Sequence, residues 1–90
     1  MNKHFSIRIG GKVQGVFFRA SAREKAEELD VKGFVRNEPD GDVYIEAEAD
    51  EYTLQQFTEW CRQGPPRARV EKVDIKEGPL TGFEVFEMRR

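Results

Sequence analysis

The spacing of apolar residues changes period on either side of residues 10–20, and this change limits the folds open to the chain. Before the segment, Phe5, Ile7 and Ile9 alternate with other residues, which is typical of a half-buried strand. After it, apolar residues recur at helical spacing through residues 22–29. The segment "GGKVQGVFFRA" therefore joins a strand to a helix, and it carries glycines, two phenylalanines and an arginine.

The rest of the chain continues to alternate between strand and helix patterns. Asp50 is a suitable N-cap for the second helix, and the Gly-Pro-Pro stretch at 64–66 ends it. Ser21 and Glu24 have the spacing of a capping box in the first helix. The pattern predicts strands over 4–13, 33–37 and 43–49, a strand around 73–75 with a bulge near Val70, a last strand over 82–88, and helices over 20–30 and 51–63.

The resulting order, β-α-β-β-α-β, is that of the α+β ferredoxin-like fold, with two helices on one face of a mainly antiparallel sheet. Residues 1–90 are expected to form a single domain. Because this fold hosts many functions, the function must be argued from a site.

Composition excludes several classes of site. The net charge is −2 and basic residues are scattered, which disfavours a nucleic-acid surface. No apolar run approaches the ~20 residues of a membrane span, and the N-terminus lacks a signal core, so a cytoplasmic protein is expected. Cys61 is the one cysteine and His4 the one histidine, so no metal site is expected and Cys61 is predicted to be a buried apolar residue.

The segment from Gly11 to Arg19 has the properties of an anion site. Glycines let backbone N–H groups approach a ligand, the loop leads into a helix N-terminus, and Arg19 supplies a planar charged fork. It is neither a Walker A loop, since Val16 follows Gly15, nor a GxGxxG fingerprint. From the residues alone, an ordinary strand-to-helix turn with a solvated arginine is the alternative.

Asn37 stands out at the end of a short strand, just before the turn "EPDG". The ordinary interpretation is turn chemistry. The functional interpretation is an amide that both donates and accepts hydrogen bonds and so orients a water molecule.

Two motifs together resemble the acylphosphatase family. Residues 11–19 read G-K-V-Q-G-V-F-F-R and match the family's G-x-V-Q-G-V-x-F-R, and residues 33–37 read G-F-V-R-N, followed by Gly41 and Val43. The similarity covers the whole chain. Two positions depart from the family's pattern: Ala49 and Asp30 stand where glycine is usual, and we expect a left-handed backbone at Asp30 to cost about 1 kcal/mol.

The resemblance implies metal-independent hydrolysis of acyl phosphates without an organic cofactor. From the composition we expect a monomer, because no long apolar patch is evident, and neither nucleic acid nor a membrane is expected as a partner. The resemblance also implies that Arg19 binds the substrate phosphate and that Asn37 positions the attacking water. The phosphate-binding loop it implies comprises Gln14, Gly15, Val16, Phe17, Phe18 and Arg19, with backbone amides from about Gly15 onward around the phosphate oxygens. This inventory suits an acyl phosphate, because a carboxylate leaving group, whose conjugate acid has a pKa near ~4, needs no proton at neutral pH.

The neighbouring residues have simpler interpretations. Phe18 is expected to anchor the loop in the core. Phe17 is expected to pack partly at the helix start, with the rim of an acyl-binding face as the alternative. Phe34 is expected to be a core or half-exposed strand residue. Lys12 and Arg36 are expected to be solvated charges that attract anions.

Three other functions are alternatives for a chain of this pattern. An RNA-binding module of the same topology would stack bases on aromatic residues, but "KGF" at 32–34 is not followed by further aromatics. A domain of a larger maturation protein acting on carbamoyl phosphate is disfavoured by the absence of zinc-finger cysteines and by a length that is the family's own. A non-catalytic anion-binding regulator is disfavoured by the presence of both Arg19 and Asn37.

Overall fold

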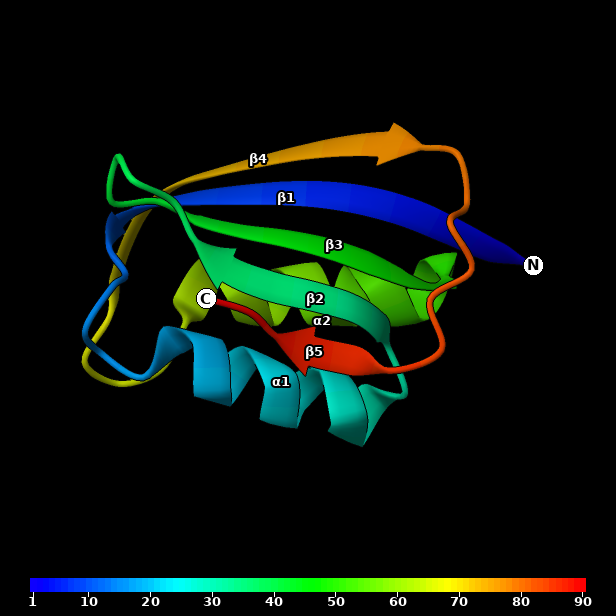
Figure 1. Cartoon of the computed structure of the whole chain (residues 1–90), viewed down its shortest axis with the longest axis horizontal. Helices are drawn as coiled ribbons and strands as arrows, with labels where there is room; N and C mark the ends of the chain where they lie inside the picture. The colour runs from blue at the N-terminus through cyan, green and yellow to red at the C-terminus, as the bar shows by residue number, and fades with distance from the viewer.

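The computed structural model describes all of residues 1–90 and has the predicted α+β fold. Two helices lie behind one face of a five-stranded sheet, and the other face is turned toward the viewer in Figure 1. The strand order is β4-β1-β3-β2-β5; β5 runs parallel to β2, and the other neighbours are antiparallel. The elements are β1 (Asn2–Lys12), α1 (Phe18–Leu29), β2 (Lys32–Asn37), β3 (Val43–Asp50), α2 (Glu51–Gln63), β4 (Arg69–Gly78) and β5 (Phe86–Met88).

The core lies between the sheet and the helices, as the alternating pattern predicts. Ile7 and Ile45 face each other across β1 and β3, and both are fully buried. Phe18 is 2% exposed and lies 5.4 Å from Trp60 of α2 between ring centroids, so it anchors the start of α1 in the core, as predicted. Cys61 is fully buried, and burial raises the pKa of its thiol, so the prediction of an inert apolar residue is confirmed.

The first helix begins earlier than the sequence predicts. It starts at Phe18 instead of residue 20, with Phe17 as an N-cap in the left-handed region at φ 65° and no side-chain cap. Ser21 lies inside the first turn, where its N–H donates to the Phe17 carbonyl, so the interpretation of its spacing as a capping box was wrong. Asp30 closes the helix in a left-handed conformation, at φ 61°.

The predicted bulge lies where β4 crosses the end of β1. Gly10 pairs with Lys72 and Gly11 pairs with Val70, so Glu71 has no partner in the register. Gly11 has φ 125°, and a Cβ there would lie 2.2 Å from the Arg69 carbonyl oxygen. Only glycine fits this close crossing, which directs the chain from β1 into the following loop.

The last strand is shorter than predicted, because a buried carboxylate holds the residues before it. Only Phe86–Met88 form β5, although a strand over 82–88 was predicted. Glu48 of β3 accepts hydrogen bonds from the backbone N–H groups of Thr81, Gly82 and Phe83, at 2.5, 3.0 and 3.2 Å. These donors are therefore satisfied by a side chain and not by a neighbouring strand.

The second helix follows the prediction at both ends. Asp50 caps it, its carboxylate accepting from the Thr53 N–H at 2.8 Å, and Gly64 ends it. Neither helix has the length and apolar character needed to cross a membrane.

Candidate active site

A pocket opens where the loop between β1 and α1 approaches the ends of β2 and β5. Its volume is about 310 Å³. Arg19 and Asn37 both contribute to it, although they lie on different elements, α1 and β2. The structure thus brings together the two residues that the motifs single out. The complete lining is Val13, Gly15, Phe17, Phe18, Arg19, Ala20, Asn37 and Met88.

The backbone of this loop presents a row of unpaired donors. No backbone N–H group from residue 14 to residue 20 donates to a protein acceptor. The N–H groups at the start of a helix have no acceptor within the helix, and here the preceding loop extends the series. Gly15 has φ 74°, and open space surrounds the position a Cβ would take. Such a row of donors, together with the partial positive charge of a helix N-terminus, favours an anion.

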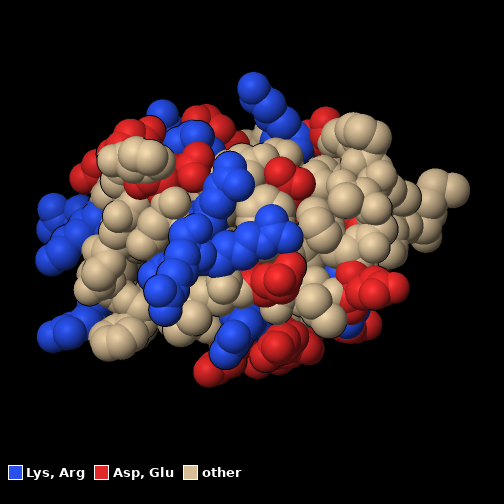
Figure 2. Space-filling view, viewed as in Figure 1, with Lys and Arg blue, Asp and Glu red and all other residues tan.

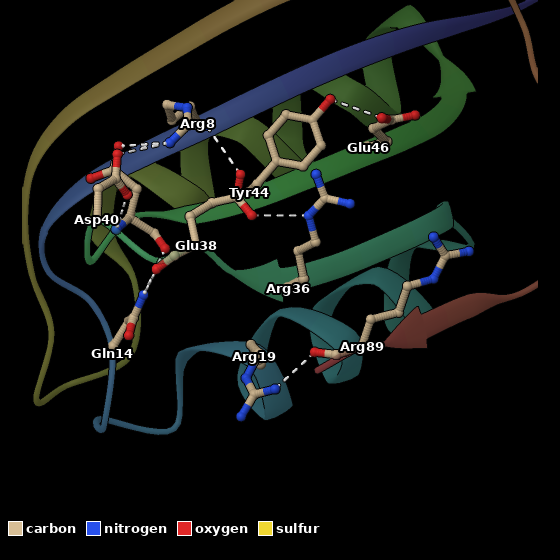
Figure 3. A network of polar contacts seen from close by, with 10 residues as sticks. Arg8, Gln14, Arg19, Arg36, Glu38, Asp40, Tyr44, Glu46 and Arg89 are labelled. Atoms are coloured by element: carbon tan, nitrogen blue, oxygen red, sulfur yellow. Dashed lines mark hydrogen bonds and ion pairs between the residues drawn. The ribbon is translucent and has the colours of Figure 1, made fainter.

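Arg19 stands in the first turn of α1, at the edge of the same pocket. Its Nη1 donates to the main-chain carbonyl oxygen of Arg89 at 2.8 Å, which Figure 3 shows as a link from α1 to the C-terminal segment. This bond uses one of the five guanidinium donors and leaves the others available. The arginine is therefore both oriented and able to bind an anion.

Asn37 is the last residue of β2. It lies on the same face of the strand as Val35, the face that packs against the helices, so its side chain is directed toward the start of α1. Its amide makes no hydrogen bond to another protein group. Both its donor and its acceptor are therefore available to a bound molecule.

Gln14 supports the loop from the side. Its Nε2 donates to the carbonyl oxygens of Glu38 and Asp42 at 2.8 and 2.9 Å, which joins the loop to the turn between β2 and β3 (Figure 3). The side chain of Gln14 is thus occupied by the protein, and only its backbone is available for an anion.

The other loop side chains divide into buried and exposed. Val16 and Phe18 are buried, at 5% and 2% exposed; Phe18 contributes to the pocket lining and Val16 does not. Phe17 is 71% exposed, so the expectation that it packs at the helix start was wrong. Its left-handed backbone turns the ring away from the core, and the ring forms part of the pocket wall.

The charges near the pocket favour a negatively charged molecule. No carboxylate contributes to the lining. Glu38, which follows Asn37, is held on the other face of the sheet by ion pairs with Arg8 and Arg36 at 3.1 and 3.0 Å. Arg36 is therefore paired and not simply solvated as expected. Figure 2 shows basic side chains gathered over β2 and the C-terminal end of the chain, next to this region.

Two contributors were missed by the sequence analysis. Met88 lines the pocket because β5 lies beside β2 in parallel, with Met88 opposite Val35. Arg89 continues this pairing, its N–H donating to the Val35 carbonyl at 2.8 Å. No local pattern in the sequence indicates which strand the last few residues will join, so the sequence alone does not indicate that Met88 and Arg89 lie at the pocket.

Comparison with known proteins shows the family of the chain. The acylphosphatase family model matches residues 5–88. The chain belongs to the acylphosphatase family. An acylphosphatase of Methylococcus capsulatus is 48% identical over 98% of this chain and 97% of its own length, and one of Rubrobacter xylanophilus is 48% identical over 97% and 80%. The solved structure of an acylphosphatase from Coxiella burnetii matches with a TM-score of 0.95 at 40% identity, over 98% of this chain and 93% of that one.

Family membership shows the activity of the chain. The chain is an acylphosphatase-family enzyme, and the activity is hydrolysis of acyl phosphates. The ferredoxin-like fold expected from the order of elements is that of the family.

Proposed function

We propose that the loop of residues 15–19 holds the phosphoryl group of the substrate and that Asn37 directs the attacking water. The observation that carries the proposal is the row of unpaired backbone N–H groups that includes Arg19, beside a pocket lined by Arg19 and Asn37. The N–H groups and the Arg19 fork bind the phosphoryl oxygens. The Asn37 amide accepts a hydrogen bond from the water and fixes its approach to phosphorus.

The reaction needs little more than positioning and charge stabilisation. The water oxygen forms a bond to phosphorus, and the bond between phosphorus and the acyl oxygen breaks. The electron pair of that bond leaves on the carboxylate, and the protons of the water remain with the inorganic phosphate. Because a carboxylate is a good leaving group, no general acid is required. This agrees with a pocket that has no acidic side chain in its lining.

The charge that spreads over the phosphoryl oxygens in the transition state is stabilised by fixed dipoles and by Arg19. Preorganised donors of this kind contribute about 10²–10³-fold each to the rate. We propose that no metal ion takes part, because the guanidinium of Arg19 and the N-terminus of α1 balance the negative charge of the phosphoryl group.

We also propose that the enzyme works as a cytoplasmic monomer. The support for a monomer is the nature of the two sheet edges. β5 is only three residues long, and the exposed edge strand β4 carries charged residues along its length. Short and charged edges discourage pairing with a second sheet. The cytoplasmic location rests on composition.

An RNA-binding function finds less support. It requires aromatic rings exposed on the open sheet face for base stacking. Phe34 is the aromatic residue of the "KGF" stretch, and it is 4% exposed, covered by Phe83 and by the Arg89 guanidinium 4.0 Å from its ring centroid. That ring is not available to a base.

The test is hydrolysis of benzoyl phosphate in the presence of EDTA, with wild type beside Arg19→Ala and Asn37→Ala. We expect metal-independent turnover in wild type and a loss of about 10²-fold or more in each variant, with circular dichroism unchanged. Arg23→Ala is the matched control, because Arg23 is exposed on the same helix and makes no ion pair. Full activity of either pocket variant would refute the role given to that residue.

A further inference from the structure

The backbone of Phe17 has an unfavourable left-handed conformation, and the packing of its side chain does not explain it. A phenylalanine in the left-handed region costs about 1 kcal/mol or more relative to a helical conformation. Its side chain is 71% exposed and pairs with no other aromatic ring, whereas the adjacent Phe18 is buried against Trp60. The position therefore presents a large apolar surface to solvent at the mouth of the pocket.

Met88 presents a second apolar surface in the same pocket. It is 42% exposed at the end of β5, opposite Val35, and Asn37 lies two residues further along β2. The two exposed apolar side chains thus belong to different ends of the sequence, and both line this pocket.

The pocket has a polar part and an apolar part. Arg19, Asn37 and the backbone donors provide the polar groups, and the other side chains of the lining are hydrocarbon or thioether. The phosphoryl group of an acyl phosphate takes the polar part, so its acyl group is left with the apolar part. A large apolar acyl group that binds there removes much more hydrocarbon surface from water than an acetyl group does.

We propose that Phe17 and Met88 form an acyl-binding wall that makes the enzyme favour acyl phosphates with an uncharged aromatic or branched aliphatic acyl group. This inference rests on the proposed function and adds the class of substrate and the residues that select it. The side chains of Phe17 and Met88 act on KM for such substrates, whereas the backbone donors of the loop and the attacking water serve every acyl phosphate.

The test compares benzoyl phosphate with acetyl phosphate in wild type, Phe17→Asn and Met88→Ala. Asparagine tolerates the left-handed conformation, so Phe17→Asn removes the ring and keeps the backbone. We expect KM for benzoyl phosphate to rise about tenfold in Phe17→Asn and about threefold in Met88→Ala, because lost apolar contacts in a binding pocket have effects of this order. In Met88→Ala, which leaves the phosphate-binding loop unaltered, KM for acetyl phosphate, kcat for both substrates and the inhibition constant of inorganic phosphate should stay within about twofold of wild type, because these depend on the polar part. In Phe17→Asn the readout is the ratio of kcat/KM for benzoyl phosphate to kcat/KM for acetyl phosphate, which should fall about tenfold.

Tyr52→Asn is the matched control, since Tyr52 is 70% exposed on α2 and lies outside the pocket. An equal rise in KM for both substrates, or a matching rise in the inhibition constant of phosphate, would overturn the proposal, because Phe17 would then act on the loop. Unchanged KM values for benzoyl phosphate in both variants would also overturn it. A folded wild type that hydrolyses neither substrate would refute the proposed function, and the acyl-binding wall would fall with it.

Discussion

Arg19 Nη1 donates a hydrogen bond of 2.8 Å to the main-chain carbonyl oxygen of Arg89, a residue 70 positions later in the chain. The same Arg89 donates its own N–H to the carbonyl oxygen of Val35 in β2, the strand that carries Asn37. Arg19, which we propose binds the phosphate, and Asn37, which we propose positions the water, are thus connected through one residue of the C-terminal segment. This link gives Arg19 a fixed orientation before any substrate binds.

The planar fork of Arg19 is predicted to matter beyond its charge. In Arg19→Lys the positive charge remains, but one ammonium group must replace donors that reach both the Arg89 carbonyl and the phosphoryl oxygens. We expect kcat/KM for benzoyl phosphate to fall about 10²-fold or more. Arg23→Lys, on the exposed side of the same helix, should retain wild-type kinetics. Near wild-type turnover in Arg19→Lys would refute the argument from geometry.

Removal of residues 89 and 90 is predicted to weaken phosphate binding. The deletion takes away the carbonyl that orients Arg19, so we expect the inhibition constant of inorganic phosphate to rise about three- to tenfold. The variant with alanine at both positions is the control, because it keeps the main-chain carbonyl and removes only the side chains. If the alanine variant lost as much affinity as the deletion, the carbonyl would not be the group that matters.

Gln14 is predicted to hold the loop through its side-chain amide. In Gln14→Glu a carboxylate replaces the donor that faces the carbonyl oxygens of Glu38 and Asp42. The resulting repulsion should lower the free energy of unfolding by about 2 kcal/mol and reduce turnover. Urea unfolding measures the first effect. Gln55→Glu, exposed on α2, should change the free energy of unfolding by less than about 0.5 kcal/mol.

Glu48 is predicted to give the fold an acid-sensitive contribution to stability. Burial opposes its ionisation, but the three backbone donors of residues 81–83 and His4, whose Nδ1 lies 2.6 Å from the carboxylate, lower its pKa below the ordinary 4.5. A carboxylate whose pKa is lowered by folding stabilises the protein at pH above 4.5 and loses this effect as the pH falls through the folded pKa.

Glu48→Gln should therefore lower the free energy of unfolding by about 2–3 kcal/mol at pH 7, and by less at pH 3. Thermal unfolding across this range measures the difference. Glu84→Gln, exposed in the same connection, is the control. A loss for Glu48→Gln that is equal at both pH values would show that the charge of the carboxylate makes no contribution.

Local patterns predicted most of the fold, because most elements here are specified by periodicity. The strands of the β2–β3 hairpin, the Asp50 cap and the bulge opposite Gly11 follow from residues that are close in sequence. The short β5 could not be predicted in this way. Its length depends on Glu48, which lies more than 30 residues earlier and satisfies the backbone donors that a longer strand would have used.

The site was predictable to the extent that its residues are adjacent in the chain. The loop of residues 11–19 and Asn37 were indicated by residue type and by the family motifs. The exposure of Phe17 was not, because an apolar residue at a helix start usually packs inward, and the left-handed backbone that turns it outward has no sequence marker other than glycine or asparagine. Met88 and Arg89 reach the pocket only through the parallel pairing of β5 with β2.

Titration of the 15N-labelled protein with inorganic phosphate, followed by amide chemical shifts, tests the central claim most directly. The account predicts that the largest shifts fall on the backbone amides of residues 15–19, with smaller ones at Asn37, and that Arg19→Ala weakens the titration without moving it elsewhere. Shifts that fell instead on the lysines of β4, or no shifts at phosphate concentrations that inhibit the enzyme, would contradict the claim that this loop holds the phosphate.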